Sequence, residues 1–189
     1  MDYKLKKKQN NFGKFHSQLD LPFLETNNEF FKEIFQTLEL HFGLKRNSNQ
    51  IFIDLGAGNG KIVIFSALFY RIKSHGIEIN SSLLGEAKSQ IKSFKMNGTI
   101  NKKIFRKIKF FLGDFYLLNL KKYDFIYVYF LPTMQKYLNH VFITAKRGSI
   151  ILSHKYRLEF FNSFLKLEYK LVHNKKKQKI CTYFYKKIS

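Results

Sequence analysis

The residues of this chain with the clearest chemical potential lie in one glycine-rich segment, Ile53–Lys61, which reads Ile-Asp-Leu-Gly-Ala-Gly-Asn-Gly-Lys. Glycine has no Cβ, so the backbone can approach a ligand closely, and a helix that starts after such a turn presents unpaired N–H groups. Carboxylates and phosphates both suit a site of this kind. A glycine triplet also occurs in ordinary strand-to-helix turns, so the interpretation needs support from other residues.

Glu78 gives that support. It ends a second short apolar segment, Gly76–Ile79, that follows the glycine-rich turn. A carboxylate in this place can accept hydrogen bonds from both hydroxyls of a ribose, because ligands of open parallel sheets bind beyond the carboxyl ends of the strands. The two features together predict a nucleoside-bearing ligand, for which NAD and S-adenosylmethionine both qualify.

Three features separate these two ligands. The spacing Gly-x-Gly-x-Gly is tighter than the Gly-x-Gly-x-x-Gly of dinucleotide sites, and Asp54 stands two residues before the first glycine. Asp114, which follows a third strand-like segment, can accept from an adenine amino group, although a polar residue ending a strand is almost as good an explanation. The C-terminal part predicts an antiparallel hairpin where a dehydrogenase has its second nucleotide-binding half.

Alternating strands and helices must position these residues. Apolar residues at intervals of three and four predict helices, and short β-branched or aromatic runs predict strands. The expected helices cover residues 27–43, 61–72, 81–96 and 132–145, and the expected strands cover residues 51–55, 76–79, 108–112, 125–130, 149–153, 164–172 and 179–185. This order predicts an α/β fold with a parallel sheet, helices on both faces and a terminal antiparallel hairpin.

The chain length favours a single domain. At 189 residues with 45% hydrophobic side chains, the sequence can form one core but leaves no room for a second substrate domain. Residues 1–26 are rich in Lys and Asn and lack periodicity, so we expect a basic N-terminal arm there. Residues 27–189 are expected to form the domain itself.

The charge balance raises the question of a nucleic-acid partner. Lys and Arg number 34 against 13 Asp and Glu, a formal net charge of +21. Such a field attracts polyanions, including RNA, the ribosome and acidic lipid surfaces. Only five of the basic residues are Arg, however, and the Lys-rich, Asn-rich composition is also typical of AT-rich coding sequence. The charge therefore leaves RNA contact open without establishing it.

The cysteine content and the hydropathy pattern limit the cellular compartments in which this chain is expected. Cys181 is the only cysteine, so no intramolecular disulfide can form, and no Cys/His metal spacing is present. The longest apolar stretch, 125–132, is shorter than a membrane span of about 20 residues. The basic N-terminus is not followed by the apolar segment of a secretory leader. These patterns predict a cytoplasmic location, and they leave the oligomeric state open.

The motif set resembles that of class I, seven-strand S-adenosylmethionine-dependent methyltransferases. The glycine loop, the acid after the second strand and the Gly-Asp after the third strand occur in the order typical of that family, within residues 51–118. The resemblance implies a Rossmann-like seven-stranded sheet and S-adenosyl-L-methionine as cofactor, with no metal. The cofactor contacts that it implies are Asp54, Gly56, Ala57, Gly58, Gly60, Glu78, Asp114 and Phe115.

A narrower resemblance points to small protein-lysine methyltransferases, the group of the archaeal broad-specificity enzymes and the methyltransferase of ATP synthase subunit c. It rests on four segments: 61–64, 76–80, 129–132 and 153–154. Asn59 and Lys61 depart from the Asp and Arg usual in that family. Residues 22–26, Pro-Phe-Leu-Glu-Thr, keep the outer Pro and Thr of a family segment near the cofactor, but place Phe23 where the family has Tyr.

Lysine methylation needs a pocket that favours an uncharged amine, because an ammonium has no lone pair. Tyr129 and Phe130, at the end of the fourth strand, are candidates for its aromatic walls, with core packing as the alternative. His154 could assist proton removal or orient the substrate, with a structural hydrogen bond as the alternative.

The sequence also excludes two other methylation chemistries. Leu131 supplies no polar acceptor where methyltransferases of amide or exocyclic nitrogens carry Asn or Asp, and Cys181 lies too far along the chain for cytosine-C5 chemistry. We therefore expect a protein substrate that presents lysine. An RNA substrate and a non-catalytic module with the same fold remain alternatives.

Overall fold

The computed structural model describes residues 28–175 and 178–189 of the chain. The predicted N-terminal arm, the segment Pro22–Thr26 and the expected helix cap Asn27 lie outside these residues, as does the tip of the Lys-rich turn at 176–177. No helix in the described ranges is long and apolar enough to cross a membrane.

A seven-stranded sheet forms the centre of the molecule, in the order β3-β2-β1-β4-β5-β7-β6. Strands β1 to β5 are mutually parallel, and β7 lies antiparallel between β5 and β6. This arrangement confirms the α/β fold with a terminal antiparallel hairpin. The strands are β1 (Ile51–Leu55), β2 (Lys73–Glu78), β3 (Ile108–Leu112), β4 (Phe125–Val128), β5 (Ile150–His154), β6 (Leu165–Lys175) and β7 (Gln178–Lys187).

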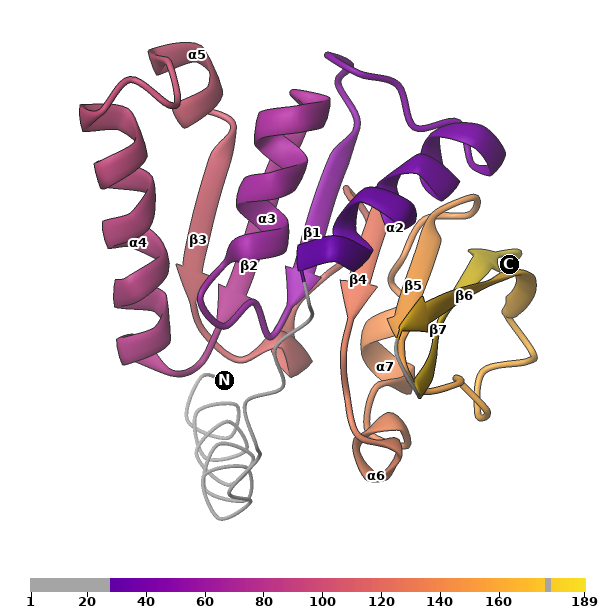
Figure 1. Ribbon diagram of the computed structural model, residues 1–189. Coiled ribbons are helices and arrows are strands. Elements are labelled where there is room, and N and C mark those ends of the chain that lie inside the picture. Colours follow the sequence, from indigo (N-terminus) through magenta and orange to yellow (C-terminus); the bar gives the residue numbers. More distant parts are fainter. Residues whose placement is uncertain (1–27, 176–177) are drawn as a thin grey trace, which may run out of the picture.

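Helices cover both faces of this sheet, as the sequence predicts. Figure 1 shows α2 (Asn28–His41), α3 (Lys61–Phe65) and α4 (Ser81–Met96) in front of the sheet and α7 (Asn139–Phe142) behind it. The short helices α5 (Lys102–Phe105) and α6 (Pro132–Gln135) lie at its two ends. The parallel strands all point to one edge, where the glycine-rich turn and the residues after β2, β3, β4 and β5 meet.

Side-chain alternation along the strands divides the core into two clusters. On β1, Phe52 packs with the α2 and α3 layer, whereas Ile53 and Leu55 pack with the α6 and α7 layer. Asp54 has the parity of Phe52, because successive residues of a strand point to opposite faces. The Asp54 side chain is therefore placed on the α2 and α3 face of the sheet, at the edge to which the parallel strands point.

Helix α2 shows why the predicted N-terminal helix forms. Phe31, Ile34, Phe35 and Leu38 share one stripe and are almost fully buried. The helix ends before Gly43, whose φ of 67° turns the chain so that the N–H of Leu44 donates to the Leu38 carbonyl at 3.1 Å.

Two predicted helices differ from the structure, one in its helix type and one in its continuity. The helix expected over 61–72 is α3 followed by a π-helical turn η1 (Ser66–Tyr70). The helix expected over 132–145 is split into α6 and α7, because the N–H groups of Tyr137 and Leu138 donate to carbonyls three residues back and tighten the chain between them. The spacing of apolar residues is similar in a continuous α-helix, in a helix with a π-helical turn and in two short helices, so the sequence pattern could not distinguish these structures.

Four predicted strands have other lengths: β6 and β7 extend to Lys175 and Lys187, and β2 and β4 also differ from the expected ranges. Strand β2 starts at Lys73 because Ser74 and His75 are buried with partners, Ser66 Oγ at 2.9 Å and the Tyr123 hydroxyl at 3.3 Å. Strand β4 ends at Val128 rather than at residue 130, since the pairing partners on β1 and β5 end at Leu55 and Ser153. Beyond that point the chain has no neighbouring strand to bond.

Candidate functional site

The glycine-rich turn is fastened to the end of β2. Gly56, Gly58 and Gly60 all have positive φ, and the N–H groups of Gly56 and Ala57 both donate to the Ile77 carbonyl at 2.9 Å. These bonds fix the path of the turn before any ligand arrives. The predicted strand–turn–helix context of the motif is therefore present.

Glu78 holds the same turn through its side chain. Its two carboxylate oxygens accept from the N–H groups of Gly58 and Asn80, each at 2.8 Å, and the residue is buried. A carboxylate has about four acceptor positions, so two remain for hydroxyl donors. The orientation of Glu78 is thus set in advance for a bidentate contact with a diol.

Gly60 serves packing rather than ligand approach. A Cβ at this position would lie 2.3 Å from Cζ of Phe110 and 3.0 Å from Cβ of Ala87. The glycine lets α3, α4 and β3 approach each other beneath the turn. Its assignment as a cofactor contact remains a prediction, and the geometry supplies a structural reason for the residue.

Asp54 brings a second carboxylate to this edge. It is almost completely buried on β1, and burial, followed by the neighbouring charge of Glu78, raises the pKa of Asp54 well above its ordinary value of 3.8. Two acidic groups so close together favour a cation over an anion such as a pyrophosphate.

The raised pKa of Asp54 gives a pH prediction. The folded state holds the Asp54 proton more tightly than the unfolded chain, so the free energy of unfolding should fall as pH rises above 3.8 towards the folded-state pKa. Over the same interval a cationic ligand should bind more tightly, because it favours the ionised carboxylate. Asp54→Asn should remove both trends. Thermal unfolding and calorimetric titration with S-adenosylmethionine across pH would measure them, and unchanged trends in the variant would assign them to another group.

Asp114 and Phe115 follow β3 at the same edge. Asp114 Oδ1 accepts from the Tyr116 N–H at 2.8 Å and caps the short 3₁₀ turn η2 (Phe115–Leu117). The ring of Phe115 stacks on Phe130 with centroids 4.9 Å apart, and a Cβ on Gly56 would lie 3.8 Å from Phe130 and 3.9 Å from Phe115. An aromatic pair therefore borders the glycine turn.

Tyr129 and Phe130 lie in different layers of the molecule. Tyr129 packs with the α2 and α3 layer and Phe130 with the α6 and α7 layer, since adjacent residues of an extended chain point to opposite sides. Tyr129 is half-buried and meets the His154 ring edge to face, with centroids 5.0 Å apart. Tyr129 and His154 therefore form one candidate pair, whereas Phe130 belongs with Phe115 beside the glycine turn.

His154 is buried at the end of β5. Its Nδ1 lies 2.9 Å from Oγ1 of Thr182, and burial, with smaller effects of the nearby His173 and Lys155, lowers the pKa of His154 to about 3. The imidazole is therefore neutral at physiological pH, so it can exchange hydrogen bonds with an amine without repelling a cation.

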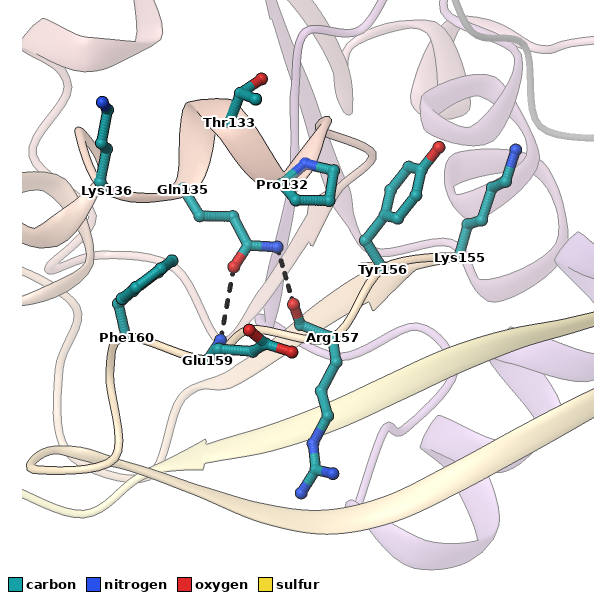
Figure 2. Close-up of a pocket in the computed structure, with 9 residues that line it drawn as sticks. All are labelled: Pro132, Thr133, Gln135, Lys136, Lys155, Tyr156, Arg157, Glu159 and Phe160. Atoms are coloured by element: carbon teal, nitrogen blue, oxygen red, sulfur yellow. Dashed lines mark hydrogen bonds between the residues drawn. The ribbon is translucent and has the colours of Figure 1, made fainter.

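A pocket of about 450 Å³ lies between α6 and the loop after β5, and the ring of Tyr156, which lines it, has its centroid 6.3 Å from that of Tyr129. Figure 2 shows Gln135 joining its two walls: the Gln135 amide donates to the Arg157 carbonyl at 2.7 Å and accepts from the Glu159 N–H at 3.3 Å. Gln135 is almost fully buried, so the pocket has a fixed floor. Its lining residues are Pro132, Thr133, Gln135, Lys136, Lys155, Tyr156, Arg157, Glu159 and Phe160.

Three residues of this region carried no signal in the sequence. Glu33 lies 140 residues from His173, and none of the three is part of a motif, yet the structure bonds Glu33 to His173, His173 to Thr182 and Thr182 to His154. In the part of the chain that the structure describes, no group of three or more His, Cys, Asp or Glu side chains could hold a metal ion.

The arrangement fits S-adenosylmethionine. Glu78 keeps acceptor positions for a diol such as a ribose, Asp54 is a second buried carboxylate at the same edge, suited to a cationic ligand, and the stacked rings of Phe115 and Phe130 offer an apolar surface. A site for a doubly anionic dinucleotide would not place two buried carboxylates in this position.

Comparison with known proteins agrees with this chemistry. The model of the ANTKMT methyltransferase domain matches residues 54–163, which is more than half of the chain. No curated protein matches the sequence.

Solved structures share the fold at low sequence identity. An RNA methyltransferase from Salinibacter ruber, in complex with S-adenosyl-L-homocysteine, superimposes with a TM-score of 0.68 at 20% identity, over 87% of this chain and 94% of that chain. The magnesium protoporphyrin IX methyltransferase of Synechocystis PCC 6803, with bound S-adenosylmethionine, gives a TM-score of 0.63 at 15% identity, over 88% and 86% of the two chains. Taken with the fold and the family match, these findings show that the chain belongs to the ANTKMT methyltransferase domain family and is an S-adenosylmethionine-dependent methyltransferase of the protein-lysine type.

Proposed function

We propose that this protein transfers a methyl group to the ε-amino group of a lysine side chain in a protein substrate, at the edge of the sheet where β4 and β5 end. The observation that carries the proposal is the pair of Tyr129 and neutral, buried His154 at the ends of β4 and β5. An aromatic ring and an uncharged hydrogen-bonding group suit an amine that must lose its charge before it reacts.

The cofactor supplies an electrophilic methyl group: the amine lone pair forms the new N–C bond as the C–S bond breaks, and its electron pair returns to sulfur. The residues of this chain would bind the cofactor and orient it. Glu78 would accept from the ribose hydroxyls, and Asp54 would balance positive charge. Asp114 accepts from the Tyr116 N–H and has further acceptor positions, with which it would accept from the adenine amino group. Phe115 would provide the neighbouring apolar surface.

The acceptor lysine must lose a proton before the transfer and another from the product amine if it is methylated again. Burial raises the pKa of Tyr129, so its phenol stays neutral and adds no negative charge that would stabilise the ammonium. The Lys155 ammonium interacts electrostatically with Tyr129 and adds positive charge nearby. Both effects favour the neutral, nucleophilic form of the lysine, and the released protons pass to solvent.

The pocket between α6 and the loop after β5 would receive residues that flank the target lysine. In Figure 2 the Tyr156 hydroxyl and the Lys155 ammonium project to the same side, away from the Arg157 guanidinium. A polypeptide segment could therefore contact both apolar and hydrogen-bonding groups there. The lone Cys181 suits a reducing compartment, so we place this reaction in the cytoplasm.

The test is a labelling experiment with purified protein, methyl-labelled S-adenosylmethionine and a cell extract. We expect label in material that protease digests and nuclease does not, and methyl-lysine after acid hydrolysis. Protein heated before the assay provides the background. Label removed by nuclease would instead make RNA the substrate, as the net charge of +21 allows. Label in an amino acid other than lysine would contradict the proposed acceptor.

A further inference from the structure

A chain of four polar side chains connects helix α2 to the candidate acceptor site. Glu33 on α2 bonds Nδ1 of His173 on β6, whose Nε2 lies 2.8 Å from Oγ1 of Thr182 on β7. The same hydroxyl lies 2.9 Å from Nδ1 of His154, and the His154 ring borders Tyr129. Figure 1 shows how α2 crosses the sheet beside the hairpin, which brings these elements together.

The inner part of the chain is shielded from water. Thr182, His173 and His154 are at most 2% exposed, whereas the Glu33 side chain is about half exposed. The Phe30 ring covers both imidazoles, with centroids 4.4 Å from His173 and 5.7 Å from His154. Because water does not compete, the direction of each hydrogen bond depends on the four groups themselves.

The carboxylate end sets that direction. A carboxylate only accepts, so Nδ1 of His173 is the donor to Glu33, and in the His173 tautomer that carries its single ring hydrogen there the lone pair is on Nε2. Thr182 must then donate its hydroxyl hydrogen to His173, and the Thr182 oxygen accepts from Nδ1–H of His154. His154 is thereby left with its hydrogen on Nδ1 and its lone pair on Nε2, the ring nitrogen that points away from Thr182.

We propose that Glu33, His173 and Thr182 are positioning residues that fix the tautomer of His154, so that its Nε2 lone pair accepts a hydrogen bond from the lysine amine. The role in the reaction rests on the proposed function. The acceptor bond would hold one N–H of the amine and leave the nitrogen lone pair free to point at the methyl group. A fixed tautomer matters because the opposite one would present an N–H donor to the amine nitrogen and occupy that lone pair.

The first test measures the tautomer without any reaction. In protein labelled with ¹⁵N-histidine, long-range proton–nitrogen correlation spectra distinguish a protonated from an unprotonated ring nitrogen. We expect His154 with its hydrogen on Nδ1, and a mixture of tautomers in Thr182→Val. Wild-type protein with the hydrogen of His154 on Nε2 would overturn the proposal.

The second test measures rate. Glu33→Ala should lower the rate of label transfer to extract proteins about ten-fold at saturating S-adenosylmethionine, the size of effect expected for a partner that orients a functional histidine. The KM for S-adenosylmethionine should not change. Glu33→Gln keeps an acceptor oxygen for His173 and should recover most of the rate. Glu39→Ala is the matched control, because Glu39 lies on the same helix and pairs with Arg46 instead.

Thr182 provides a second pair of variants. Thr182→Ser keeps the hydroxyl and should behave as wild type, whereas Thr182→Val keeps the shape and should be slow. If Glu33→Ala and Thr182→Val, both folded by circular dichroism, transferred label at the wild-type rate, the positioning role would be wrong. Failure of the proposed function looks different: wild-type protein would then place no label on lysine, whatever the tautomer of His154.

Discussion

Glu78→Ala is expected to weaken binding of S-adenosylmethionine at least 100-fold and to abolish methyl transfer. The variant would lose the two charge-assisted hydrogen bonds that we propose between Glu78 and the ribose, each worth about 1.5–3 kcal/mol, which together correspond to two or more decades in Kd. It also leaves the N–H groups of Gly58 and Asn80 without the carboxylate that now accepts from them. Isothermal titration with the cofactor measures the first effect directly.

Two further variants make this test specific. Glu86→Ala removes an exposed glutamate on the neighbouring helix α4 and should bind the cofactor normally. Glu78→Gln keeps the shape, but its amide can accept from only one of the two N–H groups, so binding should lie between that of wild type and Glu78→Ala. Normal binding by Glu78→Ala, with its fold intact, would place the cofactor site elsewhere.

Gly60→Ala is expected to destabilise the protein by about 3 kcal/mol, from a positive φ worth about 1–2 kcal/mol and overpacking worth about 1–3 kcal/mol. The new Cβ would lie 2.3 Å from Cζ of Phe110, and φ is 75°. For a chain of this size the midpoint of thermal unfolding should fall by about 6–12 °C. Thermal and urea unfolding of the ligand-free protein measure the loss.

Steric conflict and ligand contact can be separated by a double variant. Phe110→Leu removes the ring atoms that the new Cβ would meet, so Gly60→Ala should cost less in that background, with the backbone penalty remaining. Gly85→Ala is the matched control, because Gly85 lies within α4 with nothing within 4 Å of a new Cβ. It should stabilise the protein by about 0.5–1 kcal/mol. An equal cost of Gly60→Ala in both backgrounds would contradict the steric explanation.

The place in the fold of the residues expected on the cofactor side was predictable because it is local, whereas their contacts with the cofactor remain predictions. The glycine turn follows β1, Glu78 is the last residue of β2 and Asp114 lies just after β3. The carboxyl ends of parallel strands meet at one edge of the sheet. The structure adds two facts that residue spacing cannot predict. Glu78 accepts from backbone N–H groups of two loops, and the Phe110 ring leaves no space for a Cβ at Gly60.

The acceptor side was predictable only in part. Tyr129 and Phe130 are adjacent in the sequence, which predicts that they line one pocket. Successive side chains of an extended chain point to opposite sides, so the two rings pack in different core clusters on the two faces of the sheet. His154 is a candidate from the sequence because it ends the fifth strand, and its role stays a prediction. Its partners were not predictable, since Glu33 and His173 are 140 residues apart and polar side chains have no periodic signature.

The sequence by itself determined the order of strands and helices, the glycine turn, the acids at the ends of β1, β2 and β3, and through them the methyltransferase family. These follow from short-range rules of backbone conformation and hydrophobic periodicity, which act within a few residues. Only the tertiary structure decided that α2 lies against the hairpin, that Thr182 bonds two histidines, and that Tyr129 faces His154 rather than Phe130. Those contacts depend on how layers pack across the sheet, and packing joins residues that no local pattern connects.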